Sequence, residues 1–379
     1  MQCARSRGSS LSAVLLAAAL VLGLVGCGRE ERADSPPSEP AGSWRAMAES
    51  PLPGRSGRVG VWAGKEMLVW GGIGTAGPFG DGAAYDPGSD RWRVLPPAPL
   101  PARNGHVPLW TDTELLVWGG RSGTADLADG AAYSPSTDRW RPFAASPLSP
   151  RSSMAAAWTG REALYWGGRS GNSFFADGAA YNPTSNSWRR LAPSPIAGRA
   201  TFSAAWTGEE MLVWGGGSAS DFFADGAAYN PAKDTWRPIP PAPVAGRVGA
   251  ATVWTGRELV VWGGGGGDGH LADGAAYDLV AGTWRVLPPA PISPRGGQSS
   301  AWTGQKMLIW GGGDRERVND GAAYSPANDK WELLPASPLQ PRSNGSVAWT
   351  GERLLLWSGQ AGGGSPPESA PDGASFSPQ

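Results

Sequence analysis

Residues 103–145 read RNGHVPLWTDTELLVWGGRSGTADLADGAAYSPSTDRWRPFAA, and this stretch decides the fold. It divides into four short segments typical of β-strands, separated by residues typical of turns. We expect strand A from Arg103 to Trp110, strand B at ELLVWGG, strand C at GAAY and strand D from Trp140 onward. The stretch therefore predicts one antiparallel sheet of four strands.

The same pattern recurs seven times along the chain. The strand B tryptophans are separated by 48 residues five times and by 47 residues once. Two further tryptophans in each repeat complete the total of 21. The three series are Trp62, Trp110, Trp158, Trp206, Trp254, Trp302 and Trp349 in strand A, Trp70, Trp118, Trp166, Trp214, Trp262, Trp310 and Trp357 in strand B, and Trp44, Trp92, Trp140, Trp188, Trp236, Trp284 and Trp331 in strand D. A four-stranded unit at this period is the signature of a β-propeller blade, so we predict an all-β, seven-bladed propeller.

The two ends of the chain predict how the ring closes. The last repeat stops at DGASF, residues 372–376, and lacks its strand D tryptophan. The sequence SWR at 43–45 precedes the first complete strand A. We therefore expect the N-terminal strand to be the outer strand of the last blade, which removes an open sheet edge.

Composition narrows the class of partner. The chain has 32 basic and 33 acidic residues, and only 17% of its residues are charged. It therefore lacks the basic surface of a nucleic-acid-binding protein, and we predict no nucleic-acid partner. The 57 Gly and 36 Pro make up about a quarter of the chain, a density that disfavours long helices.

The N-terminus has the order of segments found in export signals. A short basic start precedes the apolar run LSAVLLAAALVLGLVG, which is too short to read as a membrane-spanning helix. The run ends in LVGC at 24–27, which resembles the bacterial lipoprotein signal; an ordinary signal peptide with an incidental Cys is the alternative. We expect a signal peptide at 1–26, a lipidated Cys27 with a disordered tether at 27–42, and the propeller at 43–379. The resemblance implies an exported protein that is lipid-anchored to the bacterial cell membrane or envelope.

Several repeated residues resemble the kelch repeat. They are the Gly-Gly pair after strand B, the tryptophan that opens strand D, and the strand C tyrosines Tyr85, Tyr133, Tyr181, Tyr229, Tyr277 and Tyr324. The resemblance implies a propeller similar to the central domain of galactose oxidase. A second tryptophan at the end of strand A and an Asp-Gly before strand C depart from the commonest kelch pattern. Kelch propellers include both binding modules and enzymes, so the resemblance leaves the activity open.

The copper site of galactose-oxidase-like enzymes needs His ligands and a Tyr cross-linked to Cys. This chain has only two histidines, His106 and His270, and no Cys in the propeller. We therefore expect no metal and no cofactor, and we expect each histidine at an exposed loop or rim position.

Two charged residues recur at one end of every repeat. They are Arg55, Arg103, Arg151, Arg199, Arg247, Arg295 and Arg342 before strand A, and Asp81, Asp129, Asp177, Asp225, Asp273, Asp320 and Asp372 before strand C. Strands A and C of an antiparallel blade start at the same end, so both series share one rim. We expect a structural ring of Arg–carboxylate contacts there. The alternative is an Arg-lined mouth that captures an anionic ligand.

Function is better sought where the repeats differ. Position three after the rim Arg and position three before the rim Asp vary on this same rim. We expect Met154, Phe174, Phe202 and Phe222 to form an exposed apolar patch there. Its charged border would contain Arg58, His106, Asp126, His270, Arg315 and Arg317. The alternative is that these loops fold over the rings and bury them.

The opposite face carries Thr-Gly turns and a recurring Glu. Glu66, Glu114, Glu162, Glu210 and Glu258 occupy one position, where Lys306 and Arg353 stand in the last two repeats. We interpret this face as a plain solvent surface without a site.

Two functions remain open at this stage. The first is a non-catalytic binding or scaffold module in the envelope, recognising a protein, peptide or glycan on the loop-rich rim. The second is a carbohydrate-active enzyme such as a sugar mutarotase, similar to the kelch-type sialic acid epimerases. That chemistry needs an acid or base with a shifted pKa in an enclosed pocket.

Overall fold

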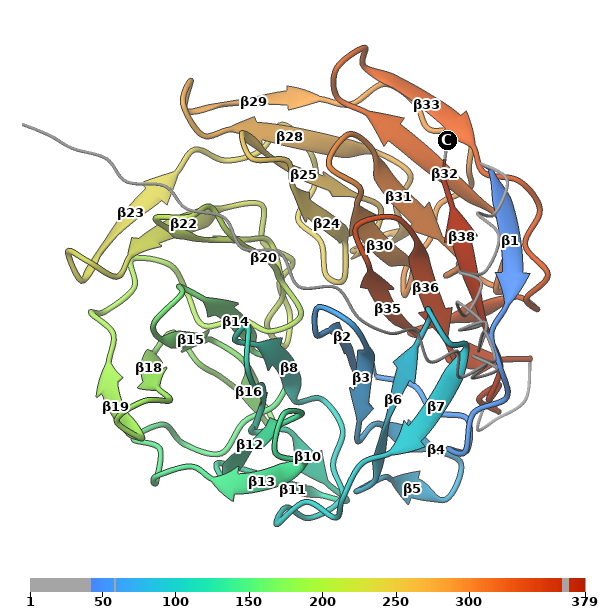
Figure 1. Ribbon diagram of the computed structural model, residues 1–379. Coiled ribbons are helices and arrows are strands. Elements are labelled where there is room, and N and C mark those ends of the chain that lie inside the picture. The colour runs from blue at the N-terminus through green and yellow to red at the C-terminus, as the bar shows by residue number, and fades with distance from the viewer. Residues whose placement is uncertain (1–41, 58, 363–367, 379) are drawn as a thin grey trace, which may run out of the picture. The chain divides into compact units, whose positions relative to one another are not determined.

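Each repeat folds into one antiparallel sheet of four strands, and seven such sheets surround a common axis (Figure 1). The computed structural model describes residues 42–57, 59–362 and 368–378. All of them belong to the unit Glu39–Gln379. The expected signal peptide, Cys27, nearly all of the expected tether and Arg58 lie outside the described residues. The described residues contain no helix long and apolar enough to cross a membrane.

The blades follow the chain in order, from strand A near the axis to strand D outside. Their strands are β2 (Gly60–Trp62), β3 (Met67–Trp70), β6 (Gly82–Asp86) and β7 (Arg91–Val94) in blade 1; β8 (Val107–Trp110), β9 (Leu115–Trp118), β12 (Gly130–Ser134) and β13 (Arg139–Pro142) in blade 2; β14 (Ala155–Trp158), β15 (Ala163–Trp166), β18 (Gly178–Asn182) and β19 (Ser187–Arg190) in blade 3; β20 (Ser203–Trp206), β21 (Met211–Trp214), β22 (Gly226–Asn230) and β23 (Thr235–Ile239) in blade 4; β24 (Ala251–Trp254), β25 (Glu258–Trp262), β28 (Gly274–Asp278) and β29 (Thr283–Val286) in blade 5; and β30 (Ser299–Trp302), β31 (Met307–Trp310), β32 (Gly321–Ser325) and β33 (Lys330–Leu333) in blade 6.

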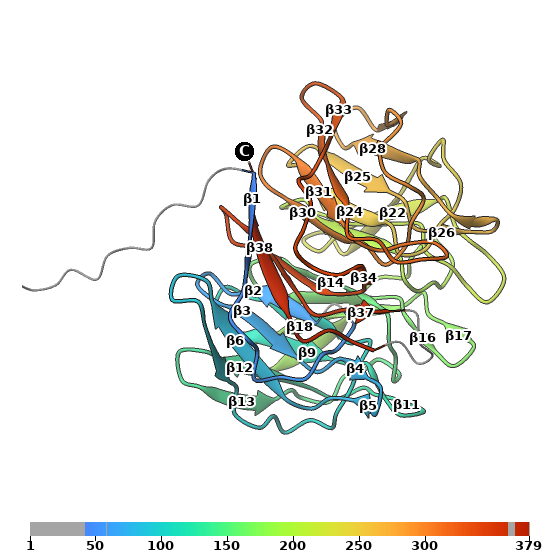
Figure 2. The same cartoon turned by 90° about the vertical axis from the view of Figure 1, so that its right-hand side faces the viewer.

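Blade 7 is built from both ends of the chain, as predicted. It contains β35 (Ser346–Trp349), β36 (Leu354–Trp357), β38 (Gly373–Ser377) and the N-terminal strand β1 (Ser43–Ala46). Strand β1 pairs antiparallel with β38, and Trp44 lies opposite Phe376. Figures 1 and 2 both show the first and last strands side by side.

Strand A is shorter than the sequence pattern predicts. In blade 2 it begins at Val107 instead of Arg103. Asn104 instead forms a bridge with Arg121 of a small outer hairpin, and Gly105 has a φ of +68°. A left-handed residue breaks the extended backbone, so the ladder starts only after it.

Short hairpins project at one end of the blades, where strand B leads to strand C (Figure 2). They pair β4 (Ile73–Gly74) with β5 (Gly77–Pro78), β10 (Arg121–Ser122) with β11 (Ala125–Asp126), β16 (Arg169–Ser170) with β17 (Ser173–Phe174), and β26 (Gly265–Gly266) with β27 (Gly269–His270). In the last blade, β34 (Arg342–Ser343) pairs with β37 (Gln360–Ala361).

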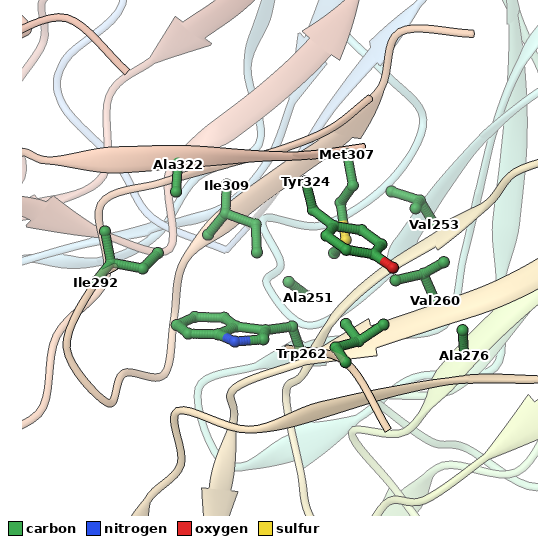
Figure 3. Packing of buried hydrophobic residues seen from close by; sticks show 11 residues of the cluster. Ala251, Val253, Val260, Trp262, Ala276, Ile292, Met307, Ile309, Ala322 and Tyr324 are labelled. Atoms are coloured by element: carbon green, nitrogen blue, oxygen red, sulfur yellow. The ribbon is translucent and has the colours of Figure 1, made fainter. Parts of the chain in front are cut away.

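Within the described residues the core consists of seven apolar clusters, and each cluster fills the seam between two neighbouring blades. Figure 3 shows the seam between blades 5 and 6, where Trp262 lies near Ile309. At every seam a strand B tryptophan contacts the strand D tryptophan of the next blade, with ring centroids 5.4–6.0 Å apart. Each strand D indole also donates Nε1–H to a carbonyl of the preceding blade. The repeated tryptophans therefore join the blades together.

Candidate functional site

The rim arginines are buried and bound within their own blades. Their side chains are 0–2% exposed, and each lies 2.7–2.9 Å from the Asp of the same repeat. In blade 4, Arg199 donates to the Gly215 carbonyl at 3.0 Å and to Asp225 Oδ1 at 2.7 Å. Its guanidinium lies 4.1 Å from the Phe223 ring centroid. A ligand at the rim would meet the half-exposed carboxylates before these buried cations.

A ring of seven left-handed residues surrounds the channel mouth, two positions after each rim Arg. Its members are Gly57, Gly105, Ser153, Thr201, Gly249, Gly297 and Asn344. Five of these residues donate their main-chain N–H to the equivalent carbonyl of the preceding blade, for example Gly249 to Thr201 at 2.9 Å. The bond from Gly57 to Asn344 joins the first blade to the last. Thr201 has a φ of +56°, a costly conformation for a β-branched residue, and bonds on both sides hold it there.

This ring lines a cavity of about 490 Å³ at the mouth of the channel. Four of the predicted binding residues, His106, Met154, Phe202 and His270, also line it. The volume lies within the range of sites that bind small molecules.

Three of these residues also close the seams beside the mouth. The side chain three positions after the rim Arg lies over the first Gly of the preceding blade's Gly-Gly pair, as His106 does over Gly71 and Phe202 over Gly167. Met154 is similarly placed and only 6% exposed. In blades 2, 3 and 4 the side chain at this variable position therefore closes a seam and also lines the cavity.

His106 is buried, contrary to the expectation of an exposed loop or rim residue. It is 3% exposed, and its ring contacts Trp70 edge to face with centroids 5.6 Å apart. Burial, together with the charge of Arg103, lowers the pKa of His106 to about 3. The imidazole is therefore neutral near pH 7 and too weakly basic for efficient proton abstraction.

The other histidine marks a polar extension of the mouth. A second cavity of about 280 Å³ shares His270, Gly296, Gly297 and Asn344 with the first. The charged residues Asp314, Arg315, Glu316 and Arg317 also line it. His270 Nδ1 lies 2.7 Å from Asp314 Oδ1. Arg317 donates to Ser343 Oγ at 3.2 Å and to the Gly362 carbonyl. The mouth is thus apolar near blades 3 and 4 and charged near blade 6.

The predicted four-residue apolar patch is not assembled in this cavity. Phe174 and Phe222 lie in the outer loops, and neither lines the cavity that contains Met154 and Phe202. Phe222 is 44% exposed, whereas Phe174 is partly buried. Asp126 faces Arg121 of the same hairpin at 3.9 Å.

The sequence pattern also misses an ion-pair network on the opposite face. Glu66, Glu114, Glu162, Glu210 and Glu258 each pair with the Arg that follows the strand D tryptophan. In blade 1, Arg93 also donates to the hydroxyl of Tyr133 in blade 2 at 2.8 Å. Burial and a bond to Asp138 raise the pKa of Tyr133 to about 12, so the phenol stays protonated. Blade 6 reverses the ion pair, with Lys306 Nζ 2.7 Å from Glu332.

Among the described residues, no group of three His, Cys, Asp or Glu side chains is placed to hold a metal ion.

Seven four-stranded blades around one channel define a seven-bladed β-propeller. A family profile described as the KLHDC2/KLHL20/DRC7 Kelch-repeats domain matches residues 42–197 and 194–363. The chain therefore belongs to the Kelch-repeat family. No curated protein matches it.

Proposed function

We propose that this chain is a non-catalytic binding module that holds an extended segment of a partner protein in the mouth of its propeller. Membership of the Kelch-repeat family supports a protein-binding scaffold in general terms. We further propose that the chain is exported and that a lipid on Cys27 anchors it to the bacterial cell envelope. The order of apolar run, small residues and Cys at 11–27 supports this part of the proposal.

One observation carries the binding proposal: the sevenfold symmetry fails at the position that lines the cavity. Blades 2 to 5 place His106, Met154, Phe202 and Ala250 at this position, and all four side chains line the cavity. Blade 6 has Gln298 there, which is buried and does not line the cavity. A structural ring alone would accept the same residue in every blade, as the rim Arg does. An asymmetric mouth can bind one segment in one orientation, with apolar side chains near Phe202 and polar groups near Arg315.

Selection of peptides tests this site directly. A displayed library of random peptides is selected on the wild-type propeller, and affinities are measured by fluorescence polarisation. Ala250→Phe should raise the Kd of selected peptides at least tenfold, because it fills the cavity with the residue that blade 4 carries at that position. Ala281→Phe, in an exposed turn on the opposite face, is the matched control. Equal affinity for wild type and Ala250→Phe would exclude the mouth as the binding site.

The anchor is tested separately in the full chain. Cys27→Ser should move the protein from the detergent-rich to the aqueous phase, because the thiol would carry the acyl chains. A Cys27→Ser protein that is processed and still partitions with detergent would contradict the lipid anchor.

A further inference from the structure

On the face opposite the rim, the described residues form cavities at two equivalent seams. One, of about 600 Å³, lies between blades 5 and 6 and is lined by Trp302, Glu258 and Arg285. The other, of about 500 Å³, lies between blades 3 and 4 and is lined by Trp206 and Glu162. In both, the strand A tryptophan of the following blade forms a wall, and the strand A to strand B turn of the preceding blade faces it.

The indole walls are half-buried and offer an N–H group. Trp302 and Trp206 pack against the seam clusters, yet both remain partly exposed. No hydrogen bond within the described part of the chain uses Nε1 of either indole. Each therefore presents an aromatic surface and a donor at its edge.

A neighbouring seam shows what satisfies such a donor. Between blades 2 and 3, Asp112 Oδ2 accepts a hydrogen bond from Trp158 Nε1 at 3.0 Å. Asp112 has a φ of +72° and stands at the turn position that Gly160 and Gly256 occupy before the two cavities. Asp112 thus places an oxygen where the other two seams leave space for an external one.

The charges around the cavities favour a neutral ligand over an anion. At the seam between blades 5 and 6, Arg285 lies 2.8 Å from Glu258, and Arg257 lies 2.7 Å from Asp278. Lys306 of the same cavity lies 2.7 Å from Glu332. The other cavity is lined by two basic and two acidic residues, Arg161, Lys233, Glu162 and Glu209, so their charges balance, and Glu162 lies 2.8 Å from Arg189. The ion-paired groups are fixed by their partners and still expose oxygens and N–H groups to a hydroxyl-rich molecule.

We propose that each seam cavity binds one pyranose unit of a neutral glycan. The C–H face of the sugar stacks on the indole of Trp206 or Trp302, and a hydroxyl oxygen accepts from Nε1 in the place that Asp112 takes for Trp158. Two such sites on one face would bind a glycan surface with higher avidity than either site alone. This inference concerns the face opposite the proposed peptide site and does not depend on that site.

The chain itself supplies a conservative blocking variant. Gly160→Asp with Gly256→Asp copies the native turn of blade 2, and no atom lies within 4 Å of a Cβ built at either glycine. Gly64→Asp with Gly351→Asp makes the same change at seams that hold neither cavity, and both glycines also have open space. Asp112→Gly is the reverse change.

Isothermal titration with maltohexaose, cellohexaose and chitotetraose is the experiment, with saturation-transfer NMR to identify the bound sugar protons. At least one of these sugars should bind the wild type at two sites. The Gly160→Asp/Gly256→Asp variant should weaken binding at least tenfold, the Gly64→Asp/Gly351→Asp variant should not, and Asp112→Gly should add a third site. Failure of all three sugars to bind, unchanged affinity of the blocking variant, or preferential binding of inorganic phosphate or an acidic peptide at these seams would overturn the proposal.

Discussion

Trp44→Ala should open the propeller at blade 7. The outer strand of this blade, β1, comes from the opposite end of the chain and is held to β38 only by non-covalent contacts. Trp44 lies 4.8 Å from Phe376 in its own blade and 6.0 Å from Trp310 in blade 6, measured between ring centroids. Its Nε1 donates to the Pro335 carbonyl at 3.0 Å. The side chain thus joins β1 both to β38 and to the neighbouring blade.

The cost can be worked from these contacts. Trp44 is partly buried, so it removes roughly 100 Å² from water, which is about 2.5 kcal/mol at about 25 cal/mol per Å². The aromatic contacts add about 1 kcal/mol and the hydrogen bond adds about 1 kcal/mol. We expect Trp44→Ala to lower the free energy of unfolding by about 4.5 kcal/mol, within the usual range for Trp→Ala.

Hydrogen exchange distinguishes ring opening from a general loss of stability. Trp284→Ala is the matched control, because Trp284 has the same place in blade 5, where strand D follows strand C along the chain. Both variants should melt at lower urea concentration, but only Trp44→Ala should expose the amides of β38 to fast exchange. Equal protection of β38 in the two variants, or a wild-type urea midpoint for Trp44→Ala, would refute the closure argument.

Three further predictions concern the rim, the mouth and the opposite face. Arg199→Ala should lower the free energy of unfolding by about 2–4 kcal/mol in a urea melt, because it leaves buried acceptors without a donor. Arg190→Ala, at an exposed arginine, should change it by less than about 0.5 kcal/mol. Equal urea midpoints for the two variants would contradict the structural role of Arg199. The pKa of His106 is lower in the folded than in the unfolded protein. The neutral, buried His106 should therefore contribute fully to stability above about pH 6.5, and this contribution should be lost as the pH falls toward 3. Over this pH range the wild type should lose more free energy of unfolding than His106→Met, as measured by urea titration at each pH. Lys306→Glu should cost about 1 kcal/mol by placing two carboxylates together, and adding Glu332→Arg should recover it in a double-mutant cycle; additive effects would exclude the pairing.

The fold could be predicted from the sequence because each repeated aromatic residue makes the same structural contact in every blade. A strand B tryptophan such as Trp70 needs a strand D tryptophan such as Trp140 from the next blade, so both recur with the same period. The missing strand D in the last repeat likewise identifies Trp44 as its replacement. Periodicity reports contacts that every blade shares, and these contacts determine the architecture.

The candidate site was harder to predict from the sequence because its residues contact residues of the neighbouring blade. His106 is buried by Gly71 and Trp70 of the preceding blade, and no pattern within its own repeat shows these neighbours. The expectation of an exposed residue was therefore wrong. Phe174 and Phe202 are the same residue type but belong to different loops. Only the folded structure shows that Phe202 lines the cavity and that Phe174 lies in the hairpin strand β17 outside it.

One missed feature did have a sequence signal. The exchange of Glu for Lys306 in blade 6 is accompanied by an exchange of Arg for Glu332, and their charges remain opposite. A paired reversal within one repeat indicates contact between the two positions. It could have identified the ion-pair network on the face that we interpreted as a plain surface.

A crystal structure of the propeller with the tightest selected peptide tests the central claim, that the asymmetric mouth is the partner-binding site. We predict peptide density within the cavity, with an apolar side chain between Met154 and Phe202 and polar groups toward His270 and Arg315. Peptide density on another surface, with the mouth free of peptide, would contradict the account.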